Sequence, residues 1–138
     1  MRVPRQVDLS MSAGADATEA RIARLFWGLW SLLLGLRFLL SAQLPLFGDE
    51  AFYAWESRHP AWAYSDLPGF TAASIAIGRW LSDDPFGIRV FSLVLGALLP
   101  LQLLRIADAA GLAALRWRVG LLGLLLPLLS LNGLLALP

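Results

Sequence analysis

An apolar run from Leu25 to Phe47, interrupted only by Arg37 and Gln43, sets the first limit on how this chain can fold. A helix over this run is about 35 Å long at 1.5 Å per residue, which exceeds the roughly 30 Å of a hydrocarbon core. Further apolar runs bring the hydrophobic share of the 138 residues to 58%, against 15% charged, with a mean hydropathy of +0.66. A soluble domain of this size cannot bury so much apolar surface, so a soluble single-domain enzyme is excluded.

Residue types that mark other classes of protein are absent or scattered. The sequence has no Cys, which excludes a disulfide scaffold, and its single His argues against a zinc site. All 11 basic residues are Arg, and they are spread along the chain rather than gathered in a patch that would bind nucleic acid. The sequence therefore predicts an all-α integral membrane protein.

Three segments are long enough to cross a membrane. We predict spans at about 25–47, 88–107 and 119–138. Arg89 and Arg105 bracket the second span, where their long side chains can reach the two interfaces.

Two shorter segments predict helices that lie in the membrane interface. The segment 69–82 is too short for an ordinary crossing. A helical stripe along it is apolar and consists of Phe70, Ala73, Ile77 and Trp80. Upstream, Asp49 is a suitable N-cap for a helix that Pro60 would end, and the aromatic residues between them suit a water–lipid boundary.

Charge indicates how many times the chain crosses. The tail 1–24, which we expect to be disordered, and the segment 105–118 are both rich in Arg, whereas the segment 48–87 holds most of the acids. Both Arg-rich segments fall on the cytoplasmic side only if 69–82 does not cross. We therefore predict three spans, an external loop at 48–87 and a cytoplasmic N-terminus. Composition suggests a multi-pass protein of a bacterial inner (plasma) membrane.

The external loop contains the residues most suited to chemistry. It opens with Asp49 and Glu50, a carboxylate pair at the start of a helix, where the helix dipole favours the ionised form. Spacing alone favours the simpler interpretation, a cap followed by an acid of the first turn. Asp66 stands in a Tyr-Ser-Asp-Leu-Pro element, where it could simply be a turn residue, and His59 precedes Pro60 as a loop residue would.

The order of three motifs resembles one enzyme family. A first span enters Gly-Asp-Glu-Ala-Phe-Tyr-Ala-Trp (48–55), Tyr-Ser-Asp-Leu-Pro (64–68) follows, and Asp-Asp-Pro-Phe-Gly-Ile-Arg-Val (83–90) leads the next span. This order is similar to the N-terminal part of GT-C glycosyltransferases of the dolichyl-phosphate-mannose protein mannosyltransferase and lipid A aminoarabinose transferase type. The resemblance covers about 25–138. It implies an inverting transfer of a sugar from a polyprenyl-phosphate carrier to an extracytoplasmic lipid, glycan or protein acceptor.

The resemblance also implies roles for individual residues. Asp49 matches the family's catalytic acid, with Glu50 beside it, and would act as general base toward the acceptor hydroxyl. Asp66 matches an acid linked to the carrier phosphate and to a divalent metal. The residues implied to lie near the substrate are Asp66, Tyr64, Arg58 and Arg89. Leu67 and Gly69 depart from the family pattern, which often has Lys or His and a second Pro there, so the cation facing the lipid phosphate is left open.

Other interpretations stay open. Arg37 lies within the first span, at an insertion cost of about 2.5–3.5 kcal/mol, either paired inside the bundle or facing a cavity. Because the family has many more spans, we expect this chain to be inactive alone, as a fragment or a small derived protein. The alternative from another class is a small non-catalytic membrane protein, an assembly partner or lipid-binding subunit. A piece of a transporter is a third reading.

Overall fold

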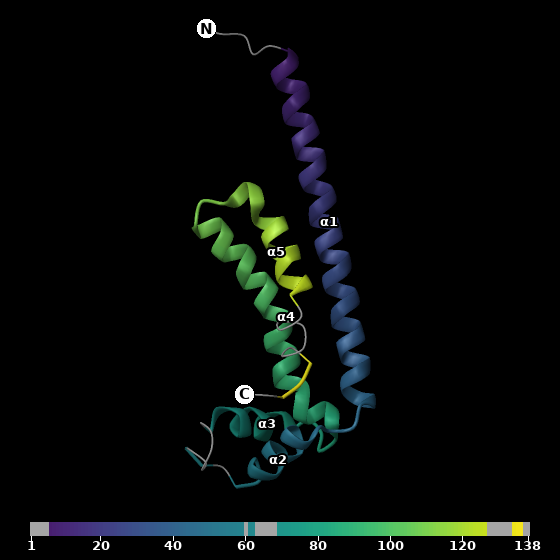
Figure 1. Ribbon diagram of the computed structural model, residues 1–138, viewed down its shortest axis with the longest axis vertical. Helices are drawn as coiled ribbons and strands as arrows, with labels where there is room; N and C mark the ends of the chain where they lie inside the picture. Colours follow the sequence, from purple (N-terminus) through teal and green to yellow (C-terminus); the bar gives the residue numbers. More distant parts are fainter. Residues whose placement is uncertain (1–5, 60, 63–68, 127–133, 137–138) are drawn as a thin grey trace.

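The computed structural model describes residues 6–59, 61–62, 69–126 and 134–136, and within these ranges all regular structure is helical (Figure 1). The elements in chain order are α1 (Gln6–Gln43), α2 (Gly48–Glu56), α3 (Phe70–Arg79), α4 (Pro85–Ala109), the 3-10 turn η1 (Ala113–Leu115) and α5 (Arg116–Leu125). Helix α4 packs against α1, α3 and α5. The short helices α2 and α3 lie across the end where α1 stops and α4 begins (Figure 1).

Among the described helices, α1 over Asp16–Gln43 and α4 over Pro85–Ala109 are long and apolar enough to cross a membrane. Only 17% of the most apolar 18-residue stretch of α1 is buried in the protein, and only 28% of the corresponding stretch of α4. A core helix of a soluble protein would be mostly covered, whereas here large apolar side chains point outward. Those on the two long helices include Leu25, Leu32, Leu39, Val94, Leu98 and Ile106.

The helix boundaries differ from the predicted spans in two places. Helix α1 begins at Gln6, so the part of the segment 1–24 that is described is helical, where we expected a disordered tail. The third span expected at 119–138 is not confirmed, and its residues 127–133 and 137–138 lie outside the described residues. Helix α5 has ten residues and ends at Leu125, because Leu126 precedes Pro127 and takes an extended conformation.

Helix α4 begins where its sequence provides a cap. Asp84 takes an extended N-cap conformation, and its Oδ1 accepts a hydrogen bond of 2.9 Å from the backbone N–H of Gly87. Pro85 follows at the first helical position, where its missing N–H costs nothing. This cap lowers the pKa of Asp84, because the N–H of Gly87 stabilises the ionised carboxylate.

The start of α2 corrects one detail of the sequence analysis. The N-cap is Phe47, and Asp49 lies inside the first turn. The backbone N–H of Phe47 donates to Glu50 Oε2 at 3.2 Å, so the third helical residue supplies the side chain that closes this end. The helix ends at Glu56, before Pro60. Asp49 therefore has no capping role in α2.

Helix α3 turns its predicted apolar stripe outward. The residues exposed on it are Phe70, Ala73, Ile77 and Trp80. The buried face instead carries Ala72, Ile75 and Gly78, and Ile75, which breaks the predicted stripe, is completely covered. An apolar face left uncovered at the end of two long apolar helices suits lipid contact.

Two glycines let α3 and its turn approach α4 closely. A Cβ atom on Gly78 would lie 2.1 Å from the carbonyl oxygen of Gly87, and one on Gly87 would lie 1.8 Å from that of Ser82. Both obstacles are backbone atoms, which cannot move aside as a flexible side chain can. The α3–α4 corner therefore depends on the absence of side chains at these positions.

Replacing Gly87 by Ala should lower the free energy of unfolding by about 1–3 kcal/mol, because the added methyl forces the turn away from α4. The matched control is Gly28→Ala in α1, where a Cβ meets nothing within 4 Å, so stability should stay equal or rise. Thermal unfolding in detergent micelles, followed by circular dichroism, measures both. Equal unfolding temperatures for the two variants would contradict the close contact.

Candidate functional site

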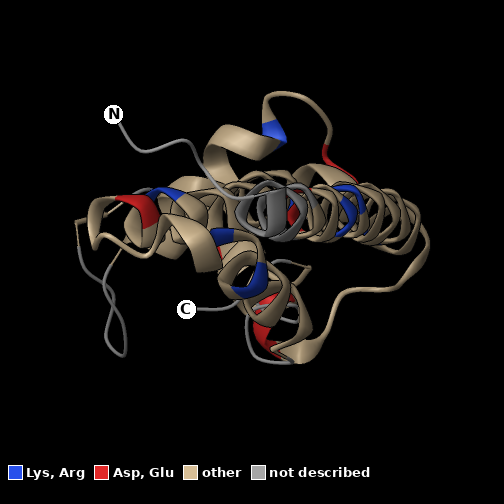
Figure 2. Ribbon diagram, turned by 90° about the horizontal axis from the view of Figure 1, so that it is seen from above, with Lys and Arg blue, Asp and Glu red and all other residues tan. Residues whose placement is uncertain are grey.

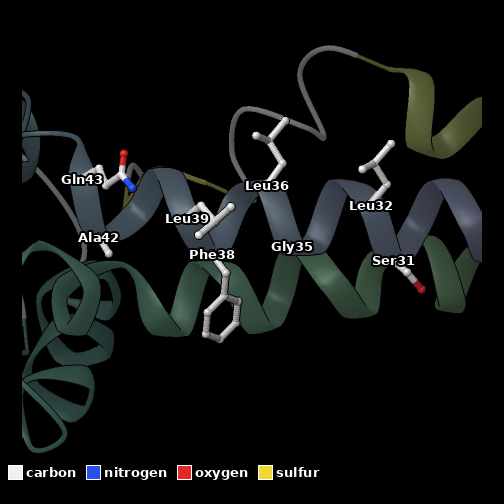
Figure 3. Close-up of a pocket in the computed structure, with 8 residues that line it drawn as sticks. All are labelled: Ser31, Leu32, Gly35, Leu36, Phe38, Leu39, Ala42 and Gln43. Carbon is white, nitrogen blue, oxygen red and sulfur yellow. The ribbon is translucent and has the colours of Figure 1, made fainter.

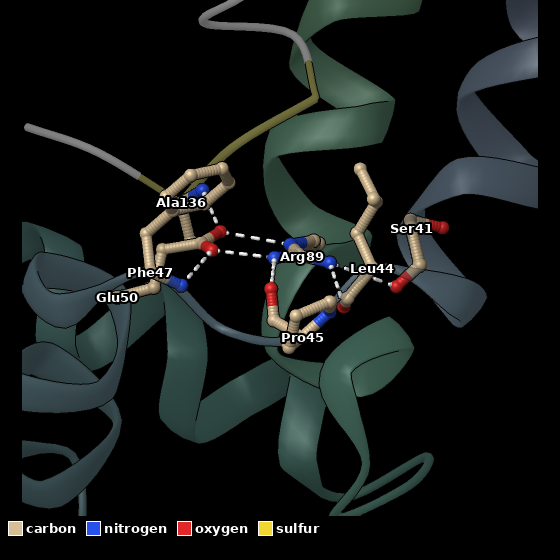
Figure 4. Close-up of polar contacts among 7 residues, drawn as sticks. All are labelled: Ser41, Leu44, Pro45, Phe47, Glu50, Arg89 and Ala136. Carbon is tan, nitrogen blue, oxygen red and sulfur yellow. Dashed lines mark hydrogen bonds and ion pairs between the residues drawn. The ribbon is translucent and has the colours of Figure 1, made fainter.

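A buried ion pair joins α2 to the N-terminal part of α4 (Figure 4). The guanidinium of Arg89 donates from Nε to Glu50 Oε1 at 2.8 Å and from a terminal nitrogen to Glu50 Oε2 at 2.5 Å. Both side chains are completely buried. The pair is bidentate, the geometry in which an Arg–carboxylate contact is strongest.

Arg89 also holds the connection between α1 and α2. Its remaining donors reach three backbone carbonyls, those of Ser41 at 3.1 Å, Leu44 at 2.8 Å and Pro45 at 2.9 Å (Figure 4). A guanidinium has five N–H groups, and all five are used here. One side chain of α4 thus fixes the last turn of α1 and the loop that follows it.

Both carboxylate oxygens of Glu50 likewise accept a full set of hydrogen bonds. Besides the two bonds from Arg89, Oε1 accepts from the backbone N–H of Ala136 at 3.0 Å and Oε2 accepts from that of Phe47. Burial by itself would raise the pKa of Glu50, but the hydrogen bonds from Arg89, Ala136 and Phe47 outweigh it. The pKa is therefore held below its ordinary value, and the carboxylate is ionised at neutral pH.

The contacts of Arg89 and Glu50 bear on the roles predicted for these two residues. Arg89 was predicted to face the carrier phosphate and Glu50 to support catalysis, yet each spends its full hydrogen-bonding capacity within the fold. Neither has a free donor or lone pair to offer a ligand in this arrangement. The structure places the two residues together in one buried ion pair.

Asp49, next in sequence to Glu50, is in the opposite situation. Its carboxylate is exposed, and it forms no hydrogen bond or ion pair with any residue that the structure describes. Because Glu50 is anchored to α4, the first turn of α2 that carries Asp49 is fixed in place. Tyr64 and Asp66, predicted to lie near the substrate and a metal, are outside the described residues.

Arg58 lines a cavity of about 330 Å³ between α2 and the α3–α4 turn. Arg79 and Asp83, which the sequence analysis did not single out, line it too, and Arg79 Nε donates to Asp83 Oδ1 at 2.5 Å. The hydrogen bond from Arg79 and its charge, with a contribution from Arg58, lower the pKa of Asp83. The i, i+4 spacing of Arg79 and Asp83 was the available sequence signal.

The cavity and Asp49 lie on different sides of α2. Ala51, Ala54 and Trp55 form the stripe of α2 that lines the cavity. At 100° per residue Asp49 is about 120–160° away from each of them around the helix axis. The structure therefore does not bring Asp49 and Arg58 to one site, although the resemblance implied that both serve the same reaction.

An apolar groove of about 630 Å³ runs along α1 (Figure 3). Its lining residues are Ser31, Leu32, Gly35, Leu36, Phe38, Leu39, Ala42 and Gln43. Leu32 and Leu36 point away from α4, whereas the ring of Phe38 packs against that of Phe86 in α4 at 5.2 Å between centroids (Figure 3). The groove ends at Gln43, the last residue of α1, four residues before Phe47 caps α2.

Arg37 has a partner within the bundle, which answers a question that the sequence left open. It is buried, and a terminal nitrogen donates to the carbonyl of Gly96 in α4 at 3.3 Å. That carbonyl is the one that Pro100, four residues later, leaves without its helical donor. Trp30 Nε1 donates to the next carbonyl, that of Ala97, at 3.0 Å. Two side chains of α1 thus bond the part of α4 weakened by its proline.

Apart from Arg37, the described charged residues lie toward the two ends of the bundle. At the end opposite α2 and α3, Arg116 pairs with Asp108 at 3.1 Å. Arg118 in the first turn of α5 pairs with Glu19 of α1 at 3.0 Å, which joins the start of α5 to the N-terminal half of α1. Figure 2, a view from above, marks the few charged positions on otherwise uncharged ribbons. Within the described ranges no group of three or more His, Cys, Asp or Glu could hold a metal ion.

Comparison with protein-family models, with curated proteins and with solved structures found no match to this chain. The resemblance to GT-C glycosyltransferases therefore depends on the three motifs and their order.

Breaking the buried pair should be costly. We expect Glu50→Gln and Arg89→Gln each to lower the free energy of unfolding by about 3–5 kcal/mol, because each leaves a buried charge without its counter-charge. The double variant should lose less than the sum of the two, since the second change removes the orphaned charge. Denaturant titration in micelles measures all three. The matched control, Arg116→Gln, breaks a partly exposed pair and should cost no more than about 1 kcal/mol.

The pair should also make stability depend on acid pH. Because the folded pKa of Glu50 lies below its ordinary value, the pair's contribution is complete above about pH 4.3, the ordinary glutamate pKa. It is lost as the pH falls from there through the lower folded pKa. As the pH falls, the free energy of unfolding should therefore decrease more steeply for the natural protein than for Glu50→Gln. Parallel curves for the two proteins would contradict the assignment.

Proposed function

We propose that this chain is the N-terminal part of an inverting membrane glycosyltransferase that takes a sugar from a polyprenyl-phosphate carrier. Its acceptor is an extracytoplasmic lipid, glycan or protein. In this proposal α1 and α4 cross a bacterial inner membrane, the N-terminus is cytoplasmic, and α2 and α3 lie in the outer interface. The separation of charges between the two ends of the bundle supports this orientation, since Arg-rich segments favour the cytoplasmic side.

One observation carries the catalytic assignment. Of the acids that the structure describes at the α2–α3 end, Asp49 alone is both exposed and without a protein partner. The others are committed to the fold, by an ion pair, a cap or burial, and they are Glu50, Glu56, Asp83 and Asp84. A general base must reach the proton that it accepts, so an exposed carboxylate on a fixed helical turn suits that role.

The mechanism follows from this assignment. The acceptor hydroxyl attacks the anomeric carbon, a bond forms between its oxygen and that carbon, and the bond to the carrier phosphate breaks. Asp49 accepts the hydroxyl proton, which contributes about 10²–10⁴-fold to the rate. Glu50 and Arg89 act as positioning residues, because their buried pair fixes the turn of α2 that carries Asp49. The groove along α1 supports the choice of carrier, because an apolar channel that ends near the first turn of α2 suits a long isoprenoid chain.

The test compares Asp49→Asn with Asp108→Asn, the same chemical change at the far end of α4. Because we expect the chain to be inactive alone, each change is made in the full-length gene to which the chain belongs. Membranes from cells that express this gene are supplied with a labelled polyprenyl-phosphate sugar, and transfer to membrane and soluble acceptors is counted. We expect Asp49→Asn to lose at least about a hundredfold in rate, and Asp108→Asn to behave like the natural protein. Asp49→Asn should unfold at the same temperature as the natural protein, and Asp108→Asn, which weakens the partly exposed pair with Arg116, should lower the free energy of unfolding by no more than about 1 kcal/mol.

Two results would contradict the proposal. Substantial transfer by Asp49→Asn would remove Asp49 from the role of base. Unchanged transfer in cells that lack the gene would favour the alternative, a small non-catalytic membrane protein that acts as an assembly partner or lipid-binding subunit.

A further inference from the structure

The cavity beside Arg58 has the composition of a site for an anion with an apolar attachment. Arg58 and Arg79 contribute two positive charges and Asp83 one negative charge, so the lining is cationic by one unit. Leu46 and Ile88 provide an apolar wall on the same cavity, and Trp55, which is 62% exposed, stands at its edge. A small inorganic anion would leave that apolar wall unused.

Arg79 is oriented by the fold rather than free to rotate. Its Nε is bound to Asp83, and one terminal nitrogen donates to the hydroxyl of Ser57 at 3.3 Å, while its side chain is 19% exposed. The other terminal nitrogen has no hydrogen bond to any described residue. Arg58 is exposed, and its guanidinium likewise has no hydrogen-bond partner in the described part of the chain. Two guanidinium groups therefore retain donors for a ligand, and guanidinium donors match phosphate oxygens well.

The position of the cavity indicates which phosphate is available to it. Leu46 lies three residues beyond the end of α1, and Asp83 lies two residues before the start of α4. The cavity therefore opens where the two candidate spans leave the apolar zone. Phospholipid phosphates occupy this depth, and exposed aromatic rings such as those of Trp55 and Trp80 are typical of it.

We infer that this cavity binds the phosphate of an anionic glycerophospholipid, with Arg58 and Arg79 on the headgroup and the wall of Leu46 and Ile88 on the start of an acyl chain. The site lies on the other side of α2 from Asp49, so the inference does not depend on the proposed transferase activity. Bound lipid would hold α2 and the α3–α4 turn against the membrane surface.

The test is lipid retention, measured by native mass spectrometry on the full chain released from nanodiscs that contain phosphatidylglycerol and phosphatidylcholine. The natural protein should keep phosphatidylglycerol in preference to phosphatidylcholine. Arg58→Gln should weaken retention at least about tenfold, because a hydrogen bond to a charged group contributes about 1.5–3 kcal/mol. Arg58→Glu should abolish it. The matched control is Arg105→Gln, which removes an exposed Arg from the other end of α4.

Arg58 carries the test because it is exposed and holds no other part of the fold, whereas Arg79→Gln would also release Ser57 and Asp83. Equal retention of the two lipids, or equal loss in Arg58→Gln and Arg105→Gln, would overturn the inference. So would displacement of the lipid by inorganic phosphate, which indicates a site for a free anion. Preference for added polyprenyl phosphate over phosphatidylglycerol would instead make this the carrier site. Asp49→Asn should leave retention unchanged, which separates this result from failure of the proposed function.

Discussion

The contact on which the end of the bundle depends is the buried bidentate pair between Arg89 and Glu50. A buried ion pair is stable only when the remaining donors and acceptors are also satisfied, because desolvation of two charges costs several kcal/mol each. Here the satisfaction comes from backbone groups of segments far apart in the chain, including the carbonyl of Leu44 and the N–H of Ala136. The pair therefore does more than link two helices. It fixes the end of α1, the start of α2, the start of α4 and residue 136 relative to one another.

A second polar arrangement follows the same rule between the two long helices. Pro100 interrupts the hydrogen bonding of α4, and in an apolar surrounding the freed carbonyl of Gly96 would be costly if left unpaired. Arg37 supplies the donor from α1, so a charged residue that is expensive to insert and a proline that weakens a helix compensate one another. Neither residue would be well accommodated alone. The two long helices are thereby joined near their middle by polar bonds and at one end by the hydrogen bond from Arg89 to the carbonyl of Ser41.

How much the sequence predicts depends on the range of the interaction. Long apolar runs predicted the two candidate spans, and Asp84 with Pro85 marks the start of α4 by a local cap. Sequence alone did not predict that Arg89 and Glu50 form an ion pair, because a motif shows that both residues occur but not that their side chains face each other. For α3 the sequence indicated the apolar stripe, which is outward, but not the buried face, which is set by the close approach at Gly78. In a membrane protein the apolar face need not be the interior one.

The first turn of α2 shows how a motif can combine two unlike tasks. Asp49 and Glu50 are adjacent, so they point about 100° apart around the helix axis. Glu50 turns inward to a complete set of donors, and this immobilises the backbone that presents Asp49 to solvent. A carboxylate whose hydrogen bonds are all internal cannot take a proton from a substrate without dismantling the fold, whereas its exposed neighbour can. Asp49 and Glu50 are thus better understood as one exposed carboxylate and one buried carboxylate that fixes the helix than as a catalytic pair. Glu50 determines where Asp49 is held, and a bound ligand would determine what the carboxylate of Asp49 does.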